Sequence, residues 1–160
     1  GSGSHPQLPN EHNAYKRLAN VTTVPDLLWF GQSGAYHCLV LTLQGPSLHD
    51  LFTFCRLKFS LKTVCLLGKQ IVTILQKIHE RHIVHRDIKP ANFLIGNLAG
   101  ESRDNIYVID FGLSRHFRSP EPPFEHSPFR EGVPVTGTAR FASINNHLGK
   151  EQSRRDDLES

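Results

Sequence analysis

The chain has 160 residues, of which 38% are hydrophobic and 21% charged, a balance typical of an ordinary globular protein with one core. A net charge of +3 with scattered basic residues argues against a nucleic-acid surface, and the lack of any run of about 18 apolar residues argues against a membrane span. Three cysteines without metal-type spacing are expected to be reduced thiols in a cytoplasmic or nuclear protein. Residues 1–4, Gly-Ser-Gly-Ser, are expected to be a linker or an expression scar.

The first part of the chain predicts a helix, a β-hairpin and a short second helix, in that order. Weak amphipathic spacing indicates the helix, and two runs rich in Leu and Val around a glycine-containing turn indicate the hairpin. A Gly-Pro pair then interrupts the chain, and the serine after it can cap a helix. The expected elements are the end of a helix at 11–19, strands at 27–30 and 36–43 around a turn at 31–34, and a helix from 47 to 54.

The clearest predicted helix runs from 61 to 82, because apolar residues recur there at steps of three and four. Ser60 is its expected N-cap. Two short apolar runs farther on predict two strands joined by a polar turn. Repeated prolines then predict a long irregular segment, which in a compact domain is usually functional. These later elements are strands at 93–95 and 106–109, a turn at 96–105, an irregular segment to about 140 and the opening of a helix at 152–160.

Two motifs carry the side chains best suited to chemistry. His85-Arg86-Asp87-Ile88-Lys89-Pro90-Ala91-Asn92 follows the long helix, and Asp110-Phe111-Gly112 follows the last predicted strand. Their order and distance are those of a protein-kinase catalytic loop and the metal-binding turn that goes with it. A lone Asp-Phe-Gly is weak, whereas both motifs together are highly specific.

Phosphoryl transfer requires a nucleophile held in line and cations held on the phosphates. Asp87 is therefore predicted to accept the proton of the substrate hydroxyl, and Lys89 to offset charge on the transferring phosphoryl group. Asn92 and Asp110 offer the hard oxygen ligands that Mg²⁺ prefers. The alternative is that these are ordinary turn, capping or solvated residues.

Several longer stretches resemble the casein kinase 1 family of serine/threonine protein kinases, and the resemblance covers nearly everything from His5 onward. The stretches are 43–52, 59–64, Ser143-Ile144-Asn145 in place of the usual Ala-Pro-Glu, and 151–160. The resemblance implies an α+β, protein-kinase-like two-lobe fold, incomplete at both ends, with 5–44 as a remnant of the small lobe and hinge and 45–160 as part of the large lobe. It also implies ATP and Mg²⁺ as cofactors and protein serine or threonine as the acceptor.

The same resemblance identifies Glu11 as the glutamate that pairs with a lysine of the small lobe. That lysine and the glycine-rich phosphate loop would lie upstream, and no Gly-x-Gly-x-x-Gly occurs in the 160 residues. We therefore expect little phosphoryl transfer by this chain alone, because positioning of the phosphates supplies most of the catalysis. The alternative of another class is a non-catalytic, pseudokinase-like interaction module.

By resemblance, further residues line the nucleotide site. The apolar ones among them would also be core residues in any fold, so plain packing stays open as an alternative. They are Leu41 as gatekeeper, Thr42 and Leu43 in the hinge, Asp50 near the ribose, and Leu94 and Ile109 against the adenine.

Arginines of the family's anion-binding patch imply protein substrates that are acidic or already phosphorylated. Arg130 and Arg140 match that patch, since a guanidinium fork suits a phosphate. Arg86, which precedes Asp87, is expected to bind an anion from the irregular segment that follows Gly112. Val133 stands where the family often has a lysine, so a preference for phosphorylated substrates stays open, as does a solvated surface role for each arginine. Thr138 belongs to the family's substrate-proximal loop, and Asp157 is expected to be buried and bonded to the catalytic-loop backbone.

Overall fold

The computed structural model describes residues 7–97, 103–119 and 121–160. The predictions for residues 1–4 and 5–6, for the middle of the polar turn (98–102) and for Pro120 fall outside the described residues. The elements are α1 Gln7–Arg17, β1 Leu27–Ser33, β2 Tyr36–Leu41, α2 Leu48–Phe54, α3 Leu61–Glu80, β3 Ile83–Val84, η1 Pro90–Asn92, β4 Phe93–Ile95, β5 Ile106–Val108, β6 Arg115–His116, η2 Ala139–Phe141, α4 Ile144–His147 and α5 Arg154–Glu159.

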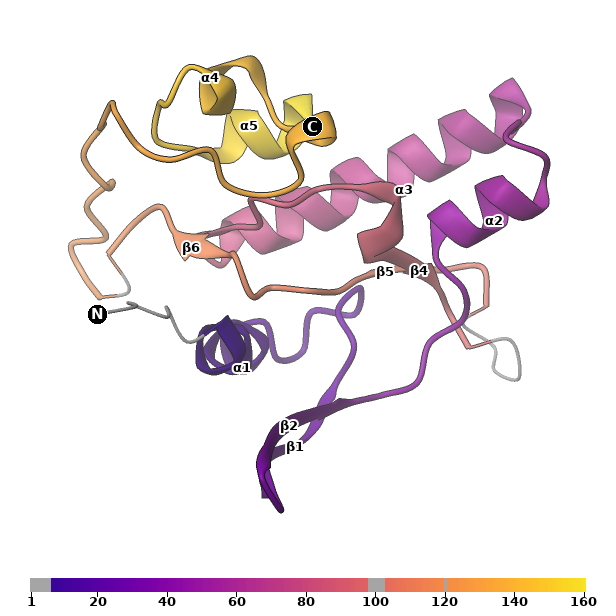
Figure 1. Ribbon diagram of the computed structural model, residues 1–160, viewed down its shortest axis with the longest axis horizontal. Coiled ribbons are helices and arrows are strands. Elements are labelled where there is room, and N and C mark those ends of the chain that lie inside the picture. Colours follow the sequence, from indigo (N-terminus) through magenta and orange to yellow (C-terminus); the bar gives the residue numbers. More distant parts are fainter. Residues whose placement is uncertain (1–6, 98–102, 120) are drawn as a thin grey trace.

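Long-range pairing builds three small antiparallel sheets within the described residues. β1 pairs with β2, β4 with β5, and β3 with β6. In Figure 1, α1 and the β1–β2 hairpin lie below the long helix α3, while α4 and α5 lie on its opposite side. The β4–β5 pair lies between these two parts, next to the loops that carry the predicted catalytic residues.

The α1–hairpin part is more regular than predicted. α1 already begins at Gln7, and Pro9 lies in its first turn, where the backbone N–H groups have no helical partner to lose. The predicted turn at 31–34 is wrong over its first three residues, because β1 continues to Ser33 and pairs Gly31 with Cys38 across the hairpin. Only the residues after Ser33 turn, with Gly34 at a φ of 60°.

Helix caps fix the two helices that follow the hairpin, as the sequence predicts. The Ser47 side chain accepts a hydrogen bond from the Asp50 backbone N–H, and the Asp50 carboxylate accepts one from the Ser47 N–H, so the two residues form a capping box. Ser60 caps α3 through the Thr63 N–H at 3.1 Å. α3 ends at Glu80, close to its predicted end, and it buries Ile74, Leu75 and Ile78.

One apolar core joins α1 to α3 through the β4–β5 pair. Its members are buried on every element that leads to the two motifs, so packing fixes where those motifs lie. Representative members are Tyr15, Leu18, Ile74, Ile78, Phe93, Val108 and Phe111. Within the described residues, no helix is long and apolar enough to cross a membrane.

The segment after the second motif is irregular, as predicted, with two exceptions. β6 pairs with β3 over two residues, and the 3₁₀ turn η2 precedes the short helix α4. The sequence prediction missed these elements. Their lengths of two to four residues carry no periodic pattern. Distant pairing defines β6, whereas α4 is capped locally by Ser143 through the Asn146 N–H.

Candidate active site

A buried carboxylate of α5 fixes the backbone of the catalytic loop. Asp157 is 2% exposed and accepts hydrogen bonds from the backbone N–H groups of His85 and Arg86, each at 2.9 Å. Its Oδ2 also lies 2.8 Å from Nε2 of His79. Arg86 has a φ of 68°, a left-handed conformation that costs a non-glycine residue about 1 kcal/mol or more. The predicted position of Asp157 is confirmed, and its two bonds stabilise the strained backbone at Arg86.

His85 connects this loop to the second motif. Its ring is fully buried, Nε2 lies 3.0 Å from the carbonyl oxygen of Ile109, and Nδ1 accepts a hydrogen bond from the Asp87 N–H at 3.3 Å. This pattern is that of an imidazole with its proton on Nε2. The ring centroid also lies 5.0 Å from that of Phe111. The position of Asp87 is therefore tied to that of the Asp-Phe-Gly turn.

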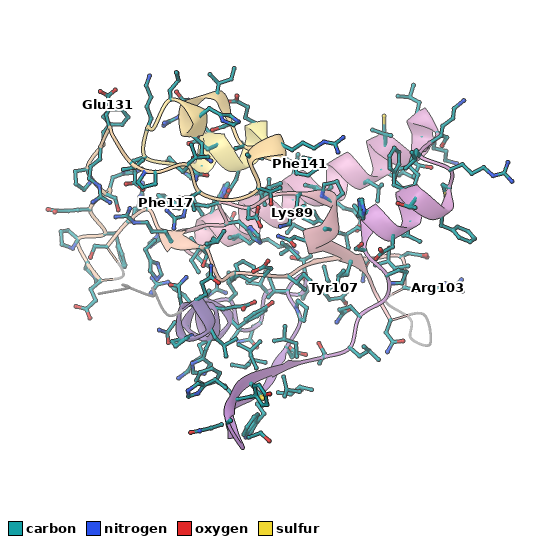
Figure 2. The ribbon with its side chains drawn as sticks, viewed as in Figure 1. Lys89, Arg103, Tyr107, Phe117, Glu131 and Phe141 are labelled. Carbon is teal, nitrogen blue, oxygen red and sulfur yellow. The ribbon has the colours of Figure 1, made fainter. Side chains whose placement is uncertain are left out.

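The carboxylate of Asp87 is surrounded by donors. Oδ2 accepts from Lys89 Nζ at 2.6 Å, while Oδ1 accepts from the backbone N–H of Thr138 at 2.8 Å and its hydroxyl at 2.7 Å. Lys89 also donates to the Thr138 hydroxyl at 3.0 Å. Burial raises the pKa of Asp87, but the bonds from Lys89 and Thr138 outweigh it and hold the pKa below its usual value. Figure 2 shows Lys89 near the middle of the molecule, whereas Arg103 and Glu131 lie at its edges.

A glycine allows Thr138 to approach Asp87. Gly137 has a φ of 94°, and a Cβ added there would overlap the carbonyl oxygen of Arg86. An L residue with a side chain is therefore excluded by both conformation and space. The irregular segment after Gly112 can reach the catalytic loop at this point only because position 137 lacks a side chain.

The two predicted metal ligands lie at one end of the β4–β5 pair. The backbone N–H of Ile109 donates to the carbonyl of Asn92 at 3.0 Å, so Asp110 is one residue beyond Asn92 in the register. Asn92 is buried and donates its amide to the Asp87 carbonyl at 3.0 Å, which leaves its side-chain oxygen as an acceptor. Asp110 is exposed and has a φ of 67°.

This donor set fits Mg²⁺ bound together with phosphate. Mg²⁺ usually keeps several waters and takes one or two protein ligands plus substrate phosphate oxygens. Asn92 and Asp110 offer two such oxygens. Among the described residues, no group of three or more His, Cys, Asp or Glu side chains is arranged to hold a metal ion by itself. The site is therefore suited to a metal that arrives with a nucleotide.

Glu11 lies on α1, on the side that faces the Asp-Phe-Gly turn. Burial and the neighbouring charge of Asp110 raise its pKa, and a hydrogen bond from the Phe111 backbone partly opposes them. Glu11 and Asp110 thus bring two carboxylates near one another at this turn. Tyr15, one turn along α1, packs its ring edge against Phe111.

The predicted hinge residues follow β2. Thr42 is fixed by exchange of hydrogen bonds with Asp26, each at 3.0 Å, and Gln44 donates its amide to the Thr42 hydroxyl at 3.2 Å. Leu41 packs against the core, whereas Leu43 is 78% exposed. The structure thus leaves Leu43 open at the surface.

The segment after the hinge pairs with β4 and so approaches the catalytic loop. Ser47 forms a bridge with Leu94, and the Gly45 N–H donates to the Ile95 carbonyl at 2.8 Å. Ile109 lies opposite Asn92 at the end of the β4–β5 pair, and Leu94, two residues farther along β4, pairs with Tyr107. Asp50 accepts two hydrogen bonds from Ser47, which lower its pKa, so one of its oxygens already serves the capping box.

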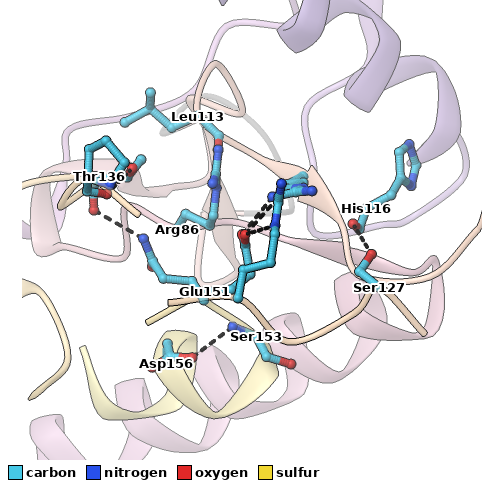
Figure 3. A network of polar contacts seen from close by, with 12 residues as sticks. Arg86, Leu113, His116, Ser127, Thr136, Glu151, Ser153 and Asp156 are labelled. Atoms are coloured by element: carbon cyan, nitrogen blue, oxygen red, sulfur yellow. Dashed lines mark hydrogen bonds and ion pairs between the residues drawn. The ribbon is translucent and has the colours of Figure 1, made fainter. Parts of the chain in front are cut away.

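Two of the three predicted anion-binding arginines share a pocket of about 210 Å³. Arg86 and Arg130 line it together with Arg115, which the sequence analysis did not single out. Glu151 bonds Arg115 Nη1 through Oε1 at 2.6 Å and Arg130 Nη2 through Oε2 at 2.8 Å (Figure 3). Arg86 donates from Nε to the Leu113 carbonyl at 2.7 Å. Burial and the charge of Arg115 lower the pKa of Arg86, and Glu151 opposes them.

Arg140 is not part of this pocket. Its guanidinium lies 5.6 Å from the ring centroid of Phe141, and it borders an apolar groove beside α2 and α3. Arg130 and Arg140 are ten residues apart but lie at different sites, because the chain turns at Gly137 and again in η2.

The protein kinase domain model matches residues 2–142 of the chain. The chain belongs to the protein kinase domain family. Among curated relatives, this kinase chain is 49%, 48% and 50% identical over 155 residues to casein kinase I homologs 3, 2 and 1 of Schizosaccharomyces pombe. The match covers 97% of the chain in each case but only 35%, 35% and 34% of the relatives, so the chain spans about a third of their length. The predicted casein kinase 1 resemblance and kinase-like α+β fold are confirmed.

Two residues of this kinase site were missed from the sequence. Arg115 lies shortly after the Asp-Phe-Gly turn, and Glu151 opens the stretch used only for its family resemblance. An arginine and a glutamate so far apart give no local signal of pairing. Arg115 lies two residues after Leu113, whose carbonyl accepts a hydrogen bond from Arg86, but only the structure shows that this brings Arg115 near Arg86.

Proposed function

We propose that the protein is a serine/threonine protein kinase of casein kinase 1 type, which transfers the γ-phosphoryl group of ATP to protein serine or threonine. The observation that carries this proposal is the contact of Asp87 with Lys89 and Thr138, next to the oxygens of Asn92 and Asp110. Such a site positions a hydroxyl and neutralises phosphate charge, which is most of what phosphoryl transfer needs from a protein. Bound Mg²⁺ would supply charge neutralisation on the phosphates, held by Asn92 and Asp110.

Asp87 acts mainly by orienting the acceptor hydroxyl. A carboxylate with a lowered pKa is ionised at neutral pH but is a weak general base, so it takes up the proton late in the transfer. The Thr138 hydroxyl marks where a substrate hydroxyl would donate to this carboxylate. Lys89 bonds both of them and is positioned to follow the charge onto the transferring phosphoryl group.

The nucleotide would lie between the hinge and the β4–β5 pair. Leu41 would be the gatekeeper, and Thr42 and Leu43 would provide the hinge. Ile109 lies opposite Asn92, and Leu94 is two residues farther along β4, so an adenine next to the phosphate-binding residues would pack against both. In this arrangement residues 5–44 belong to the small lobe and hinge, and 45–160 to the large lobe. Glu11 and Asp50 would contact the phosphate-anchoring lysine and the ribose, respectively.

Protein substrates would include acidic or already phosphorylated ones, in a cytoplasmic or nuclear setting. The pocket lined by Arg86, Arg115 and Arg130 supports this, since it brings three guanidinium groups together with a single carboxylate, that of Glu151. Glu151 already pairs with two of these arginines, and Val133 adds no charge. A phosphorylated segment would therefore gain less here than in an unpaired arginine cluster. The measurement is kcat/KM for matched serine, aspartate and phosphoserine peptides.

The deciding experiment is phosphorylation of casein with labelled ATP by the wild-type protein and by Asp87→Asn. The variant should lose nearly all transfer, whereas Asp104→Asn, a change at a fully exposed carboxylate, should leave it unchanged. Phosphorylation that survives in Asp87→Asn would contradict the proposal. No transfer by wild type would instead favour a non-catalytic interaction module. We expect the 160-residue segment assayed by itself to be weak, because it contains no glycine-rich phosphate loop motif.

A further inference from the structure

Asn10 of α1 donates to the turn that contains the Asp-Phe-Gly motif. Its Nδ2 lies 3.0 Å from the carbonyl oxygen of Gly112, 3.0 Å from that of Ser114 and 3.4 Å from that of Phe111. An amide NH₂ has two hydrogens, so these carbonyls share them in bifurcated bonds. The contact joins residues about one hundred positions apart in sequence, so tertiary packing and not local structure creates it.

The carbonyl of Leu113, which Asn10 does not bind, accepts a hydrogen bond from the catalytic loop. Arg86 of the catalytic loop donates to the Leu113 carbonyl at 2.7 Å, and the Ser114 N–H closes the turn onto the Phe111 carbonyl at 3.0 Å. Every carbonyl from 111 to 114 therefore accepts a hydrogen bond. The donors come from α1, from the catalytic loop and from the turn itself, so the turn is clamped between two elements.

The clamp bears directly on Asp110. This residue has a φ of 67°, a conformation that other contacts must stabilise for a non-glycine residue. On its N-terminal side, Ile109 is fixed by the Asn92 carbonyl and the His85 ring. On its C-terminal side, Asn10 and Arg86 are the only described residues whose side chains donate to the carbonyls of residues 111–114.

We infer that Asn10 is a positioning residue that sets the orientation of the metal-binding turn and makes α1 and Asp110 move together. The inference rests on the proposed kinase function and extends it to a residue outside both motifs. The amide is needed because all three partners are acceptors. An aspartate at position 10 would place oxygens against carbonyl oxygens, and a leucine of similar shape would leave those carbonyls without a donor.

The test compares Asn10→Asp and Asn10→Leu with Asn13→Asp and Asn13→Leu in the protein. Asn13 is exposed on the same helix, and its side chain makes no hydrogen bond to the described residues, so its variants match the change in charge and in helix propensity. The first readout is the Mg²⁺ concentration for half-maximal phosphorylation. Asn10→Asp should raise this half-maximal Mg²⁺ concentration about tenfold and lower kcat, with the peptide KM unchanged. Loss of a few hydrogen bonds costs about 1.4 kcal/mol, which corresponds to about a tenfold change in an equilibrium constant. Asn10→Gln, which keeps the amide, should recover part of the loss.

The second readout is amide hydrogen exchange at residues 110–115, which needs no catalytic activity. Exchange there should speed up on the order of tenfold in both Asn10 variants and remain unchanged in α3. Asn10 variants that match their Asn13 counterparts in Mg²⁺ dependence and in exchange would overturn the inference. If wild type transfers no phosphate, the kinase proposal fails, and the exchange comparison still decides whether Asn10 fixes the turn.

Discussion

Replacing Asp157 by asparagine tests whether a buried carboxylate fixes the catalytic loop. In the wild type, Oδ1 accepts the Arg86 N–H, and Oδ2 accepts the His85 N–H and contacts His79. Asparagine has the same shape but replaces one oxygen by a donor. If the amide nitrogen takes the Oδ1 position, it faces the Arg86 N–H, and if it takes the Oδ2 position, it faces the His85 N–H. Either orientation leaves a buried backbone N–H unpaired.

The magnitude follows from these contacts. A hydrogen bond to a charged group is worth about 1.5–3 kcal/mol, and a buried donor left unpaired costs about 1–3 kcal/mol. We expect Asp157→Asn to lower the free energy of unfolding by about 2–4 kcal/mol. Release of the strained conformation at Arg86 should also move Asp87, and a shift of about 1 Å at a reacting group can cost about 100-fold in rate.

The assay pairs denaturant unfolding with phosphorylation kinetics, measured well below the melting midpoint of each variant. The matched control is Asp156→Asn, the adjacent buried aspartate, whose oxygens bind Ser143 and Ser153 and not the catalytic loop. Both variants should be less stable, but only Asp157→Asn should lose kcat while still folded. Equal kcat values for the two folded variants would refute the reasoning.

Three further predictions concern single positions. Ser47→Ala should lower the stability by about 1 kcal/mol through loss of the α2 cap, and an unchanged melting midpoint would argue against the capping box. Gly137→Ala should destabilise the protein and slow transfer more than Gly132→Ala does, since both have positive φ but only the Cβ at 137 meets another atom; equal effects would contradict this. The pKa of Asp87 is lower in the folded protein than its ordinary value of 3.8, so the ionised carboxylate stabilises the fold. This stabilisation is fully present above pH 3.8 and is lost as the pH falls through the folded-state pKa. The difference in free energy of unfolding between wild type and Asp87→Asn should therefore shrink on acidification below pH 3.8. A difference in stability that grows below pH 3.8 would show that folding raises, rather than lowers, the pKa of Asp87.

Elements with strong local signals were predictable from the sequence. α3 shows apolar residues at helical spacing, and Ser47 and Ser60 stand where N-cap residues are favoured. The hairpin was predicted from its two apolar runs, although its turn was placed too early. Gly31 looked like a turn residue, but its hydrogen bonding across to β2 keeps it in the strand.

Elements defined by distant partners were not predictable in the same way. The first turn of α1 (residues 7–10) contains a single aliphatic residue and Pro9, so it shows no apolar periodicity that would predict a helix before Glu11. β3 and β6 are two residues each and exist only because residues 83–84 pair with 115–116. Their pairing was invisible to any periodicity argument, yet it positions the start of the catalytic loop.

The residues of the candidate site likewise fall into those predictable from local sequence and those defined by distant partners. The motifs predicted Asp87, Lys89, Asn92 and Asp110, because catalytic residue types at fixed spacing are a local signal. The partners of these residues come from far along the chain. Thr138 reaches Asp87 across 51 positions, and the pairing of Glu151 with Arg115 spans 36.

Asp87 and Asp157, the two buried carboxylates at the catalytic loop, accept hydrogen bonds from different kinds of donor. This difference distinguishes a residue placed to react from one that holds the loop in position. Asp87 accepts one hydrogen bond from a backbone N–H, that of Thr138, and its other two strong donors are the Lys89 ammonium and the Thr138 hydroxyl, which rotate and can exchange for a substrate hydroxyl. Asp157 takes its bonds from two backbone N–H groups, which cannot rotate away without unwinding the loop. A change at the first site should therefore reduce rate with a small cost in folding. A change at the second should reduce both, because the geometry of the reacting carboxylate depends on a backbone that only the second one fixes.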